Sequence, residues 1–493
     1  MLFNSLHFLA FFPIVVTIYF LLAPKWRWVL LLLASYYFYM SWKAEYIVLI
    51  IISTLIDYFA ANRMAKIPNR AGRKKYLYLS LLSNLGILFG FKYFNFFSDN
   101  VQSVIDQFSW TYSFPELSFL LPVGISFYTF QTLSYTIDVY YDRLKPEKHL
   151  GIFAVYVSFF PQLVAGPIER AGKLLPQFRE TFHFNYDRIK LGCILMLWGF
   201  FKKIAIADRL AEFTNPVYNN PAGYDAISTL IATYAFAFQI FCDFSGYSDI
   251  AIGCALVLGY QLMENFRRPY YSLSIREFWT RWHISLSTWF RDYVYIPLGG
   301  NRVVQWKMYY NLMLTFLISG LWHGANWTFI IWGGLHGLYL IIERVGKGFF
   351  DGLINRSKGI LGGSITYLLN VFIIFHLALF AWIFFRVNHI GDAWIILSNI
   401  CSFDITNPVG ELMTWLDKSK RPAFFGLNNL IIAFACFAVM QFIHICQERG
   451  WDFKQLAFKQ SLIVRWSFYT IILFMIINFG KFLGKSDFIY FQF

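Results

Sequence analysis

The sequence predicts an all-α, polytopic integral membrane protein with roughly eleven to fourteen membrane-embedded helices. Composition is the first observation behind this prediction. Of 493 residues, 58% are hydrophobic and only 14% are charged, whereas a soluble chain carries about 25% charged residues. The second observation is a series of uncharged apolar runs, since a spanning helix needs about 20 such residues. These runs are 1–24, 28–42, 76–91, 308–342, 366–385 and 426–447.

The formal net charge of +14 has a local source. Six basic residues and no acidic residue lie between Arg63 and Lys75, which is typical of a cytoplasmic loop under the positive-inside rule. No groove-reading element accompanies them, so we expect no nucleic-acid partner. The six cysteines are scattered, mostly in apolar runs, and their spacing predicts no metal site.

The N-terminal third begins with three apolar segments in residues 1–60, and a fourth span follows at about 76–97. The apolar segment 120–147 contains Gln131, Ser134 and Asp138. Spacings of three and four place these polar side chains on one helical face. Such a face is expected to contact protein or water and not lipid. A helix–helix contact and a tunnel wall both fit.

Two further segments are too irregular or too long for a single straight span. Residues 158–178 contain three prolines and Gly166, which favours a re-entrant segment. Residues 226–262 contain Asp243 and Asp249 within apolar sequence, and buried carboxylates need partners or water. A structural polar cluster beside a cavity is favoured over a metal site, because no further ligands lie at suitable spacing.

Residues 263–307 form a polar insert rich in aromatic side chains. Arg276, Arg281 and Arg291 alternate with tryptophans at near-helical spacing. One interpretation is an interfacial amphipathic helix, with Trp at the lipid headgroups. The other is that these arginines bind an anionic donor such as a phosphate-bearing thioester carrier. The two interpretations are compatible.

The run from Met308 to Ile342 has no charged residue and as one helix would extend roughly 50 Å, against about 30 Å for a bilayer core. We expect a break at 320–326, where two glycines flank polar residues. Non-helical backbone at membrane depth must be buried in protein or line a wet cavity. His323 lies in this break, where a titratable ring is costly and usually functional.

His323 is a candidate general base, because its near-neutral pKa suits proton transfer from a hydroxyl. No covalent-nucleophile or nucleotide-binding motif is present, which favours direct attack of a hydroxyl on an activated acyl group. His336 is a weaker candidate, since it can share a site with His323 only across a helix break. His376 is central in an apolar span, and a hydrogen-bonded structural role is expected.

Four motifs resemble the membrane-bound O-acyltransferase family, in the branch that acetylates bacterial polysaccharides such as alginate and peptidoglycan. They are PQLVAGPIER at 161–170, DFSGYSDIAIG at 243–253, REFWTRWHISLSTWFRDYVYIPLGGNR at 276–302 and SGLWHGANWTFIIWGGLHG at 319–337. The resemblance implies that His323 is catalytic, that His283 is a second functional residue, and that helices surround a central tunnel. The tunnel would join a cytoplasmic acyl donor to the far side of the membrane.

The C-terminal sequence Phe488-Ile-Tyr-Phe-Gln-Phe493 resembles the aromatic motif of a small partner protein in teichoic-acid D-alanylation. The resemblance implies that Tyr490 accepts the acyl group as an aryl ester. A phenol has a pKa of about 10, so it would need a base such as His323. The alternative is an interfacial aromatic anchor.

The expected protein is therefore a single transmembrane domain over 1–493, with an insert at 263–307 and an aromatic tail at 485–493, in the bacterial cytoplasmic (inner) membrane. It would move acetyl from acetyl-CoA or another acyl thioester to an exported polysaccharide. A periplasmic SGNH-type acetyltransferase would complete the transfer, with membrane lipid as the other partner and no metal. A teichoic-acid D-alanyltransferase and a transporter without chemistry remain alternatives.

Overall fold

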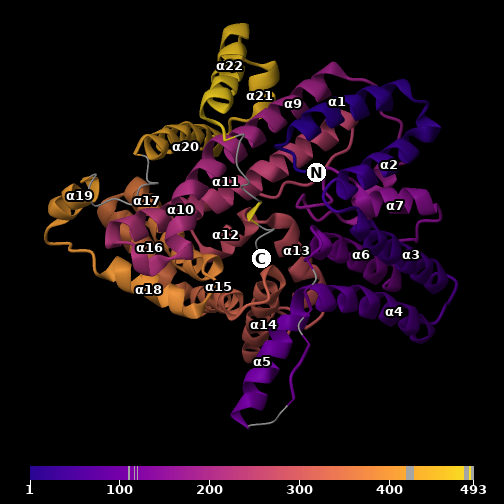
Figure 1. Ribbon diagram of the computed structural model, residues 1–493, viewed down its shortest axis with the longest axis horizontal. Helices are drawn as coiled ribbons and strands as arrows, with labels where there is room; N and C mark the ends of the chain where they lie inside the picture. The colour runs from indigo at the N-terminus through magenta and orange to yellow at the C-terminus, as the bar shows by residue number, and fades with distance from the viewer. Residues whose placement is uncertain (109–111, 116, 119, 418–426, 482–487, 490–493) are drawn as a thin grey trace. The chain divides into compact units, whose positions relative to one another are not determined.

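The computed structural model describes residues 1–493 except 109–111, 116, 119, 418–426, 482–487 and 490–493. The described residues are built from α-helices joined by short 3₁₀ and π segments, and they contain no β-strand (Figure 1). The all-α prediction is confirmed.

Contacts divide the chain into two compact units. Unit 1 comprises residues 1–196 and 247–264, and unit 2 comprises residues 197–246 and 265–493. Two helices, α9 (Tyr186–Phe200) and α11 (Ala226–Leu258), cross the boundaries between the units along the chain. The single domain that the sequence favours stays a prediction.

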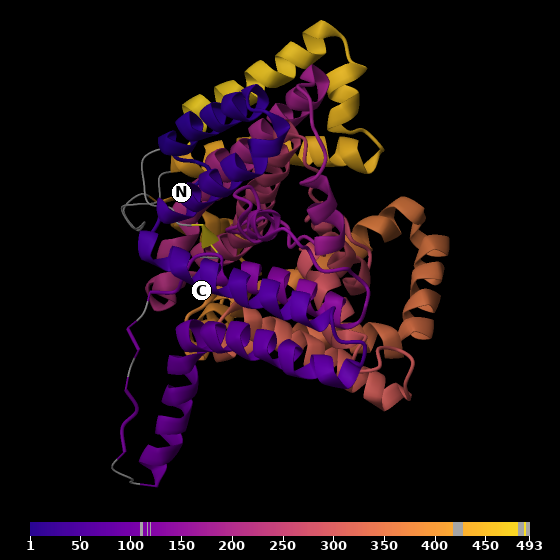
Figure 2. The same cartoon turned by 90° about the vertical axis from the view of Figure 1, so that its right-hand side faces the viewer.

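The other helices of unit 1 follow one another with short connections. They are α1 (Leu6–Leu21), α2 (Arg27–Met40), α3 (Ile47–Met64), α4 (Arg70–Leu88), α5 (Phe94–Gln107), α6 (Ile125–Tyr140), α7 (Leu150–Ser158) and α8 (Ala171–Gln177). A π segment, Phe89–Tyr93, separates α4 from α5, and α5 projects away from the rest of unit 1 (Figure 2).

Buried polar side chains join the helices of unit 1. Asp57 on α3 is fully buried and accepts hydrogen bonds from Asn84 and Ser80 on α4. On α6, Gln131 donates to the Tyr156 carbonyl of α7 at 2.6 Å. Buried polar groups need such partners. The predicted polar face at Gln131 therefore contacts protein, which supports the helix–helix interpretation there.

The prediction that residues 158–178 do not form one straight helix is confirmed, whereas their re-entrant path stays a prediction. Helix α7 ends at Ser158, a non-helical stretch follows, and α8 begins only at Ala171. Most of the stretch is buried, including Glu169, whose side chain accepts the Met263 N–H. Proline-rich backbone therefore lies in the interior of unit 1, as expected for a segment that cannot continue a helix.

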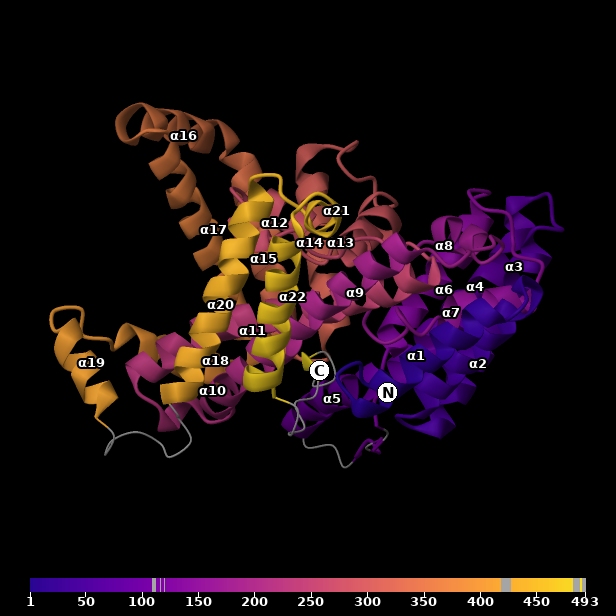
Figure 3. The same ribbon diagram turned by 90° about the horizontal axis from the view of Figure 1, so that it is seen from above.

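Unit 2 holds the remaining helices. They are α10 (Asp208–Asn219), α12 (Ile275–Arg281), α13 (Ile284–Phe290), α14 (Gln305–His323), α15 (Trp327–Val345), α16 (Lys347–Leu361), α17 (Gly363–Arg386), α18 (Ile390–Cys401), α19 (Pro408–Leu416), α20 (Leu427–Glu448), α21 (Phe453–Phe458) and α22 (Leu462–Phe479). Helices α14 and α15 lie side by side (Figures 1 and 3), and α16 turns away from α17 in Figure 3.

Six helical stretches in the described part of the chain are long and apolar enough to cross a membrane. They are Ala44–Met64, Arg70–Gln107, Ala226–Leu258, Gly363–Arg386, Ile431–Glu448 and Leu462–Phe479. Large apolar side chains are exposed along them, such as Phe474 at 59% and Ile477 at 61%, as expected for lipid contact. The chain is a multi-pass membrane protein. The number of embedded helices predicted from the sequence is larger than six, because it also counts short and broken segments. A criterion based on helix length does not identify such segments.

The insert at 263–307 is not one amphipathic helix. Two short helices, α12 and α13, are followed by a π segment, Arg291–Tyr295. Trp282 and Trp289 are 1% and 5% exposed, so both rings are covered by protein, and Trp282 packs against Phe241 and Trp382. The placement of these tryptophans at the lipid headgroups was wrong, because a large apolar ring fits a protein core as well as an interface.

Candidate functional site

The predicted break in the run 308–342 is confirmed. Helix α14 ends at His323, and α15 begins at Trp327. Gly324 is extended between them, and Asn326 caps α15 by accepting the Thr328 N–H at 3.0 Å. The Asn326 side chain also donates to the Asn388 carbonyl at 2.7 Å. The break therefore has defined geometry and places His323 at a helix end.

Two glycines bring the backbones of α14 and α15 together. A Cβ on Gly320 would overlap the Phe329 carbonyl, and one on Gly333 would overlap the Phe316 carbonyl. Small residues at helix contacts allow this close approach in membranes. The helix that ends at His323 therefore packs backbone against backbone with α15 at these two glycines.

His323 lies in an aromatic enclosure within unit 2. Its side chain is 3% exposed. The ring centroid lies 4.9 Å from those of Trp322 and Trp332 and 5.3 Å from that of Phe385. The His283 ring is 6.4 Å away. The two histidines that the sequence named as functional are therefore neighbours, although 40 residues separate them.

His283 occupies a strained backbone position between α12 and α13. Its φ of 41° is in the left-handed region, which is uncommon for a residue with a side chain and is often found at functional sites. Asn265 holds this turn, because its carbonyl accepts the Ile284 N–H and its side chain accepts both the N–H and the hydroxyl of Ser285. The Phe244 ring packs against the imidazole at 4.5 Å.

Electrostatics favour neutral imidazole at His283. The side chain is fully buried, and this burial lowers the pKa of His283 well below the usual histidine value. The segment lies between two short helices, outside the six long apolar stretches. A neutral imidazole has one nitrogen that accepts a hydrogen bond or a proton and one that donates a hydrogen bond, so His283 in this form can orient a hydroxyl or a neighbouring ring.

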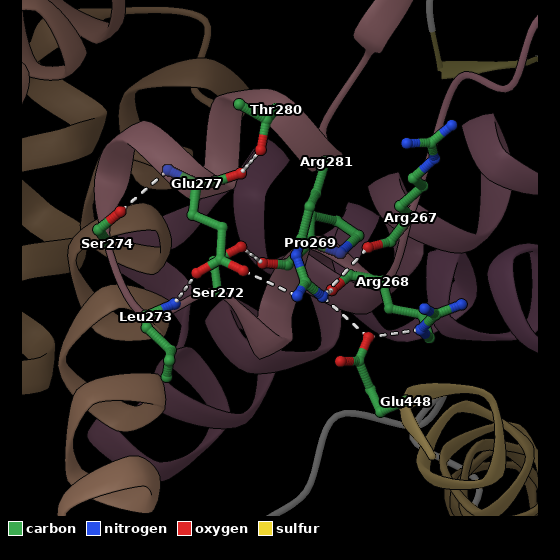
Figure 4. Close-up of polar contacts among 10 residues, drawn as sticks. All are labelled: Arg267, Arg268, Pro269, Ser272, Leu273, Ser274, Glu277, Thr280, Arg281 and Glu448. Atoms are coloured by element: carbon green, nitrogen blue, oxygen red, sulfur yellow. Dashed lines mark hydrogen bonds and ion pairs between the residues drawn. The ribbon is translucent and has the colours of Figure 1, made fainter. Parts of the chain in front are cut away.

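The arginines proposed for the donor differ in their surroundings. Arg281 forms ion pairs of 2.8 Å with Glu277 and with Glu448, which also pairs with Arg268 (Figure 4). Arg276 is exposed on α12, and Arg291 is exposed with Asp292 beside it at 2.8 Å. Donor binding by all three stays a prediction. Arg276 and Arg291 have the exposure that a donor requires, whereas Arg281 fastens α12 to α20.

His336 and His376 are two further histidines that lie within apolar runs of the sequence. His336 is fully buried on α15, and its ring, like that of His323, lies about 5 Å from Trp332. His376 on α17 is hydrogen-bonded to the Tyr234 hydroxyl at 2.6 Å and to the Phe372 carbonyl at 2.7 Å. The hydrogen bonding expected for His376 is confirmed, and its structural role stays a prediction.

Some site features were not visible in the sequence. Asn265 is a single asparagine outside any motif that the sequence analysis identified. Its role depends on hydrogen bonds with Ile284 and Ser285, which lie much further along the chain. Asp243 was recognised as needing a partner, but Lys203, its partner at 2.7 Å, was not identified. Tyr490 lies outside the described residues. The described residues hold no group of three or more His, Cys, Asp or Glu side chains suited to a metal ion.

The hairpin of α14 and α15 and the neighbouring histidine pair lie in a part of the chain that matches a known family. Residues 149–385 match the membrane-bound O-acyltransferase family. The chain belongs to this family and is therefore an O-acyltransferase, as the four motifs predicted.

Individual relatives show where in the family the similarity is strong. The chain is 40% identical over 454 residues to a probable alginate O-acetylase of Pseudomonas aeruginosa, covering 90% of this chain and 82% of that protein. It is 36% identical to a peptidoglycan O-acetyltransferase of Helicobacter pylori, covering 81% and 80%. It is 30% identical to a teichoic acid D-alanyltransferase of Bacillus subtilis, covering 55% and 69%.

Proposed function

We propose that the protein transfers acetyl from a cytoplasmic thioester, acetyl-CoA, to a hydroxyl of an exported or cell-wall polysaccharide. The observation that carries the proposal is the pairing of His323 and His283 in one buried aromatic enclosure of an O-acyltransferase. Similarity over nearly the whole chain to proteins named for alginate and peptidoglycan O-acetylation supports the acceptor class. Localisation would be the bacterial cytoplasmic membrane, with the chain working as one domain around a tunnel.

In this proposal His323 is the general base and His283 assists it. The acceptor hydroxyl loses its proton to His323 while its oxygen attacks the thioester carbonyl. The carbon–sulfur bond then breaks, and the departing thiolate takes the proton from the imidazole. The products are an oxygen ester and a free thiol, and His323 returns to its neutral form. Arg276, Arg281 and Arg291 would bind the phosphates of the donor.

Tyr490 is proposed as the first acceptor. Acetyl would move from the thioester to the phenol oxygen, releasing thiol. It would then move from this aryl ester to a serine of a periplasmic SGNH-type acetyltransferase, restoring the phenol. An aryl ester is activated for the second transfer, because phenolate is a better leaving group than an alkoxide.

Mass spectrometry of the C-terminal peptide tests this relay. After incubation of the purified protein with acetyl-CoA, the proposal predicts an acetyl adduct on Tyr490 and equimolar free thiol. Tyr490→Phe should lose both the adduct and acetylation of the acceptor. Full acceptor acetylation by Tyr490→Phe would reject the relay.

A D-alanyl donor is the second candidate, and the similarity to a teichoic acid D-alanyltransferase favours it. Competition between acetyl-CoA and a D-alanyl carrier-protein thioester separates the two. If the protein consumes the D-alanyl carrier-protein thioester and not acetyl-CoA, the transferred group is D-alanyl.

A further inference from the structure

A buried charged cluster lies near the histidine pair, and the chemistry described above does not use it. Lys203 forms 2.7 Å ion pairs with both Asp208 and Asp243. The three side chains are at most 8% exposed. Helix α11 approaches closely here, since a Cβ on Gly246 would lie 2.8 Å from the Gly199 carbonyl. Burying ions is costly unless each is paired and hydrogen-bonded, so the cluster requires an explanation.

The hydrogen bond that the second carboxylate oxygen of Asp243 accepts explains why these charges are buried. Asp243 Oδ2 accepts the backbone N–H of Ile489 at 2.8 Å. This bond joins positions 246 residues apart and is charge-assisted, a strong type of hydrogen bond. One carboxylate therefore pairs with Lys203 through one oxygen and with the chain's C-terminal segment through the other.

Residues that follow Lys203 in the sequence also contact the C-terminal segment, at positions before Ile489. Arg209 Nε donates to the Phe479 carbonyl at 3.0 Å. The Lys481 N–H donates to the Ile204 carbonyl at 3.2 Å, and its ammonium pairs with Glu212 at 2.7 Å. Ile204 lies in a π segment, Phe201–Ala207, a type of helix irregularity often found at functional sites.

The tail residues after these contacts are buried beside the histidine pair. Phe488 and Ile489 are each 1% exposed. The centroid of the Phe488 ring lies 5.8 Å from that of Phe244, and the Phe244 centroid lies 4.5 Å from that of His283. Ile489 immediately precedes Tyr490 in the sequence. Asp243 thus binds the backbone N–H of the residue that immediately precedes the proposed acyl acceptor in the sequence.

We propose that Lys203, Asp208, Arg209 and Asp243 form a tail cradle, a binding site for the chain's own C-terminal segment that positions it for acyl transfer. Asp243 is the positioning residue of the cradle, and its 2.7 Å ion pair with Lys203 fixes the orientation of the Asp243 carboxylate. The positioning role rests on the proposed function, whereas binding of the tail does not. An interfacial anchor would have no need of a buried carboxylate.

Hydrogen–deuterium exchange of the full-length protein in nanodiscs tests tail binding directly. Ile489→Pro removes the N–H that Asp243 accepts, restricts the local backbone, and leaves the charged side chains of the cluster in place. We expect exchange of the C-terminal peptide to rise about tenfold to a hundredfold, the range for loss of a charge-assisted hydrogen bond. Asp243→Ala should act alike. Ile489→Val, which keeps the N–H, should show the protection of the wild type.

Kinetics on the same variants test positioning. Loss of the cradle should lower kcat for transfer to the acceptor at least about tenfold and leave KM for the donor unchanged. Wild-type exchange in Ile489→Pro would overturn tail binding. Raised exchange with unchanged kcat would overturn positioning. If His323→Gln kept full activity, the proposed function would fail while a positive exchange result would still support the cradle.

Discussion

At the scale of single residues, two departures from regular helix geometry create the site. His323 ends α14 just before the break at Gly324, and His283 adopts φ = 41° between two short helices. The side chain of a residue at a helix end can extend beyond the helix. It can then contact groups that a side chain in the middle of the helix does not reach. The 6.4 Å contact between the rings follows from both departures.

The strained conformation of His283 predicts how substitutions there behave. Asparagine tolerates left-handed φ, whereas a β-branched residue does not. His283→Asn should keep the wild-type melting temperature within a few degrees and lower acyl transfer about 100-fold, the usual contribution of acid–base catalysis. His283→Val should lose activity and also unfold at lower temperature. Thermal unfolding in detergent and thiol release measure the two effects. Full activity in a folded His283→Asn would contradict a chemical role.

Glu169 predicts a pH dependence of stability. Burial raises the pKa of this carboxyl from 4.5 to about 7. Between these values the folded state keeps a proton that the unfolded state releases, so the free energy of unfolding falls as pH rises through this window. The melting temperature should therefore fall from pH 5 to pH 8. Glu169→Gln should flatten the profile and melt higher at pH 8. Parallel profiles for the two proteins would refute this account.

At the scale of helices, the residues around His323 predicted where the run 308–342 breaks. They did not predict the contact between α14 and α15 that follows from the break. Glycine and asparagine around His323 predicted where α14 would end, because local geometry depends on neighbouring residues. The close approach of Gly320 and Gly333 depends on how two helices fold back on each other, which one sequence does not reveal. The amphipathic interpretation of 263–307 failed in part for the same reason, since Trp282 and Trp289 suit either environment.

The glycine contact yields a matched pair of substitutions. A Cβ on Gly320 would overlap the α15 backbone, whereas one on Gly334 would meet only Leu317 Cδ2 at 3.5 Å. Gly320→Ala should cost about 1–3 kcal/mol by overpacking and lower activity by moving His323. Gly334→Ala should match or slightly exceed the wild-type stability, because alanine favours helix. Equal melting temperatures for both variants would show that the hairpin is not tightly packed.

At the scale of the whole molecule, composition was sufficient for the class of protein. The scarcity of charge and the apolar runs predicted a multi-pass, all-α chain, and both features are confirmed. Long-range pairs were beyond prediction, because nothing local links Lys203 to Asp243 or Asp243 to Ile489. Short and broken helices also obscured how many segments enter the membrane.

Membrane orientation follows from the basic loop between α3 and α4. Six basic residues from Arg63 to Lys75 lie at the end of α3, in the loop and in the first turns of α4, so this end of the two helices should face the cytoplasm. A cysteine at the exposed Pro68 should resist an impermeant maleimide in intact cells and react after permeabilisation. Labelling in intact cells would place the loop outside and reverse the proposed direction of acyl transfer.

The most direct test of the central claim is thioester turnover by purified protein carrying His323→Gln. His376→Gln is the matched control, because it removes another histidine from an apolar helix without touching the site. With acetyl-CoA and the acceptor present, release of free thiol should fall at least about 100-fold in His323→Gln and stay near the wild-type rate in His376→Gln. Thiol release at the wild-type rate by a correctly folded His323→Gln would contradict the account.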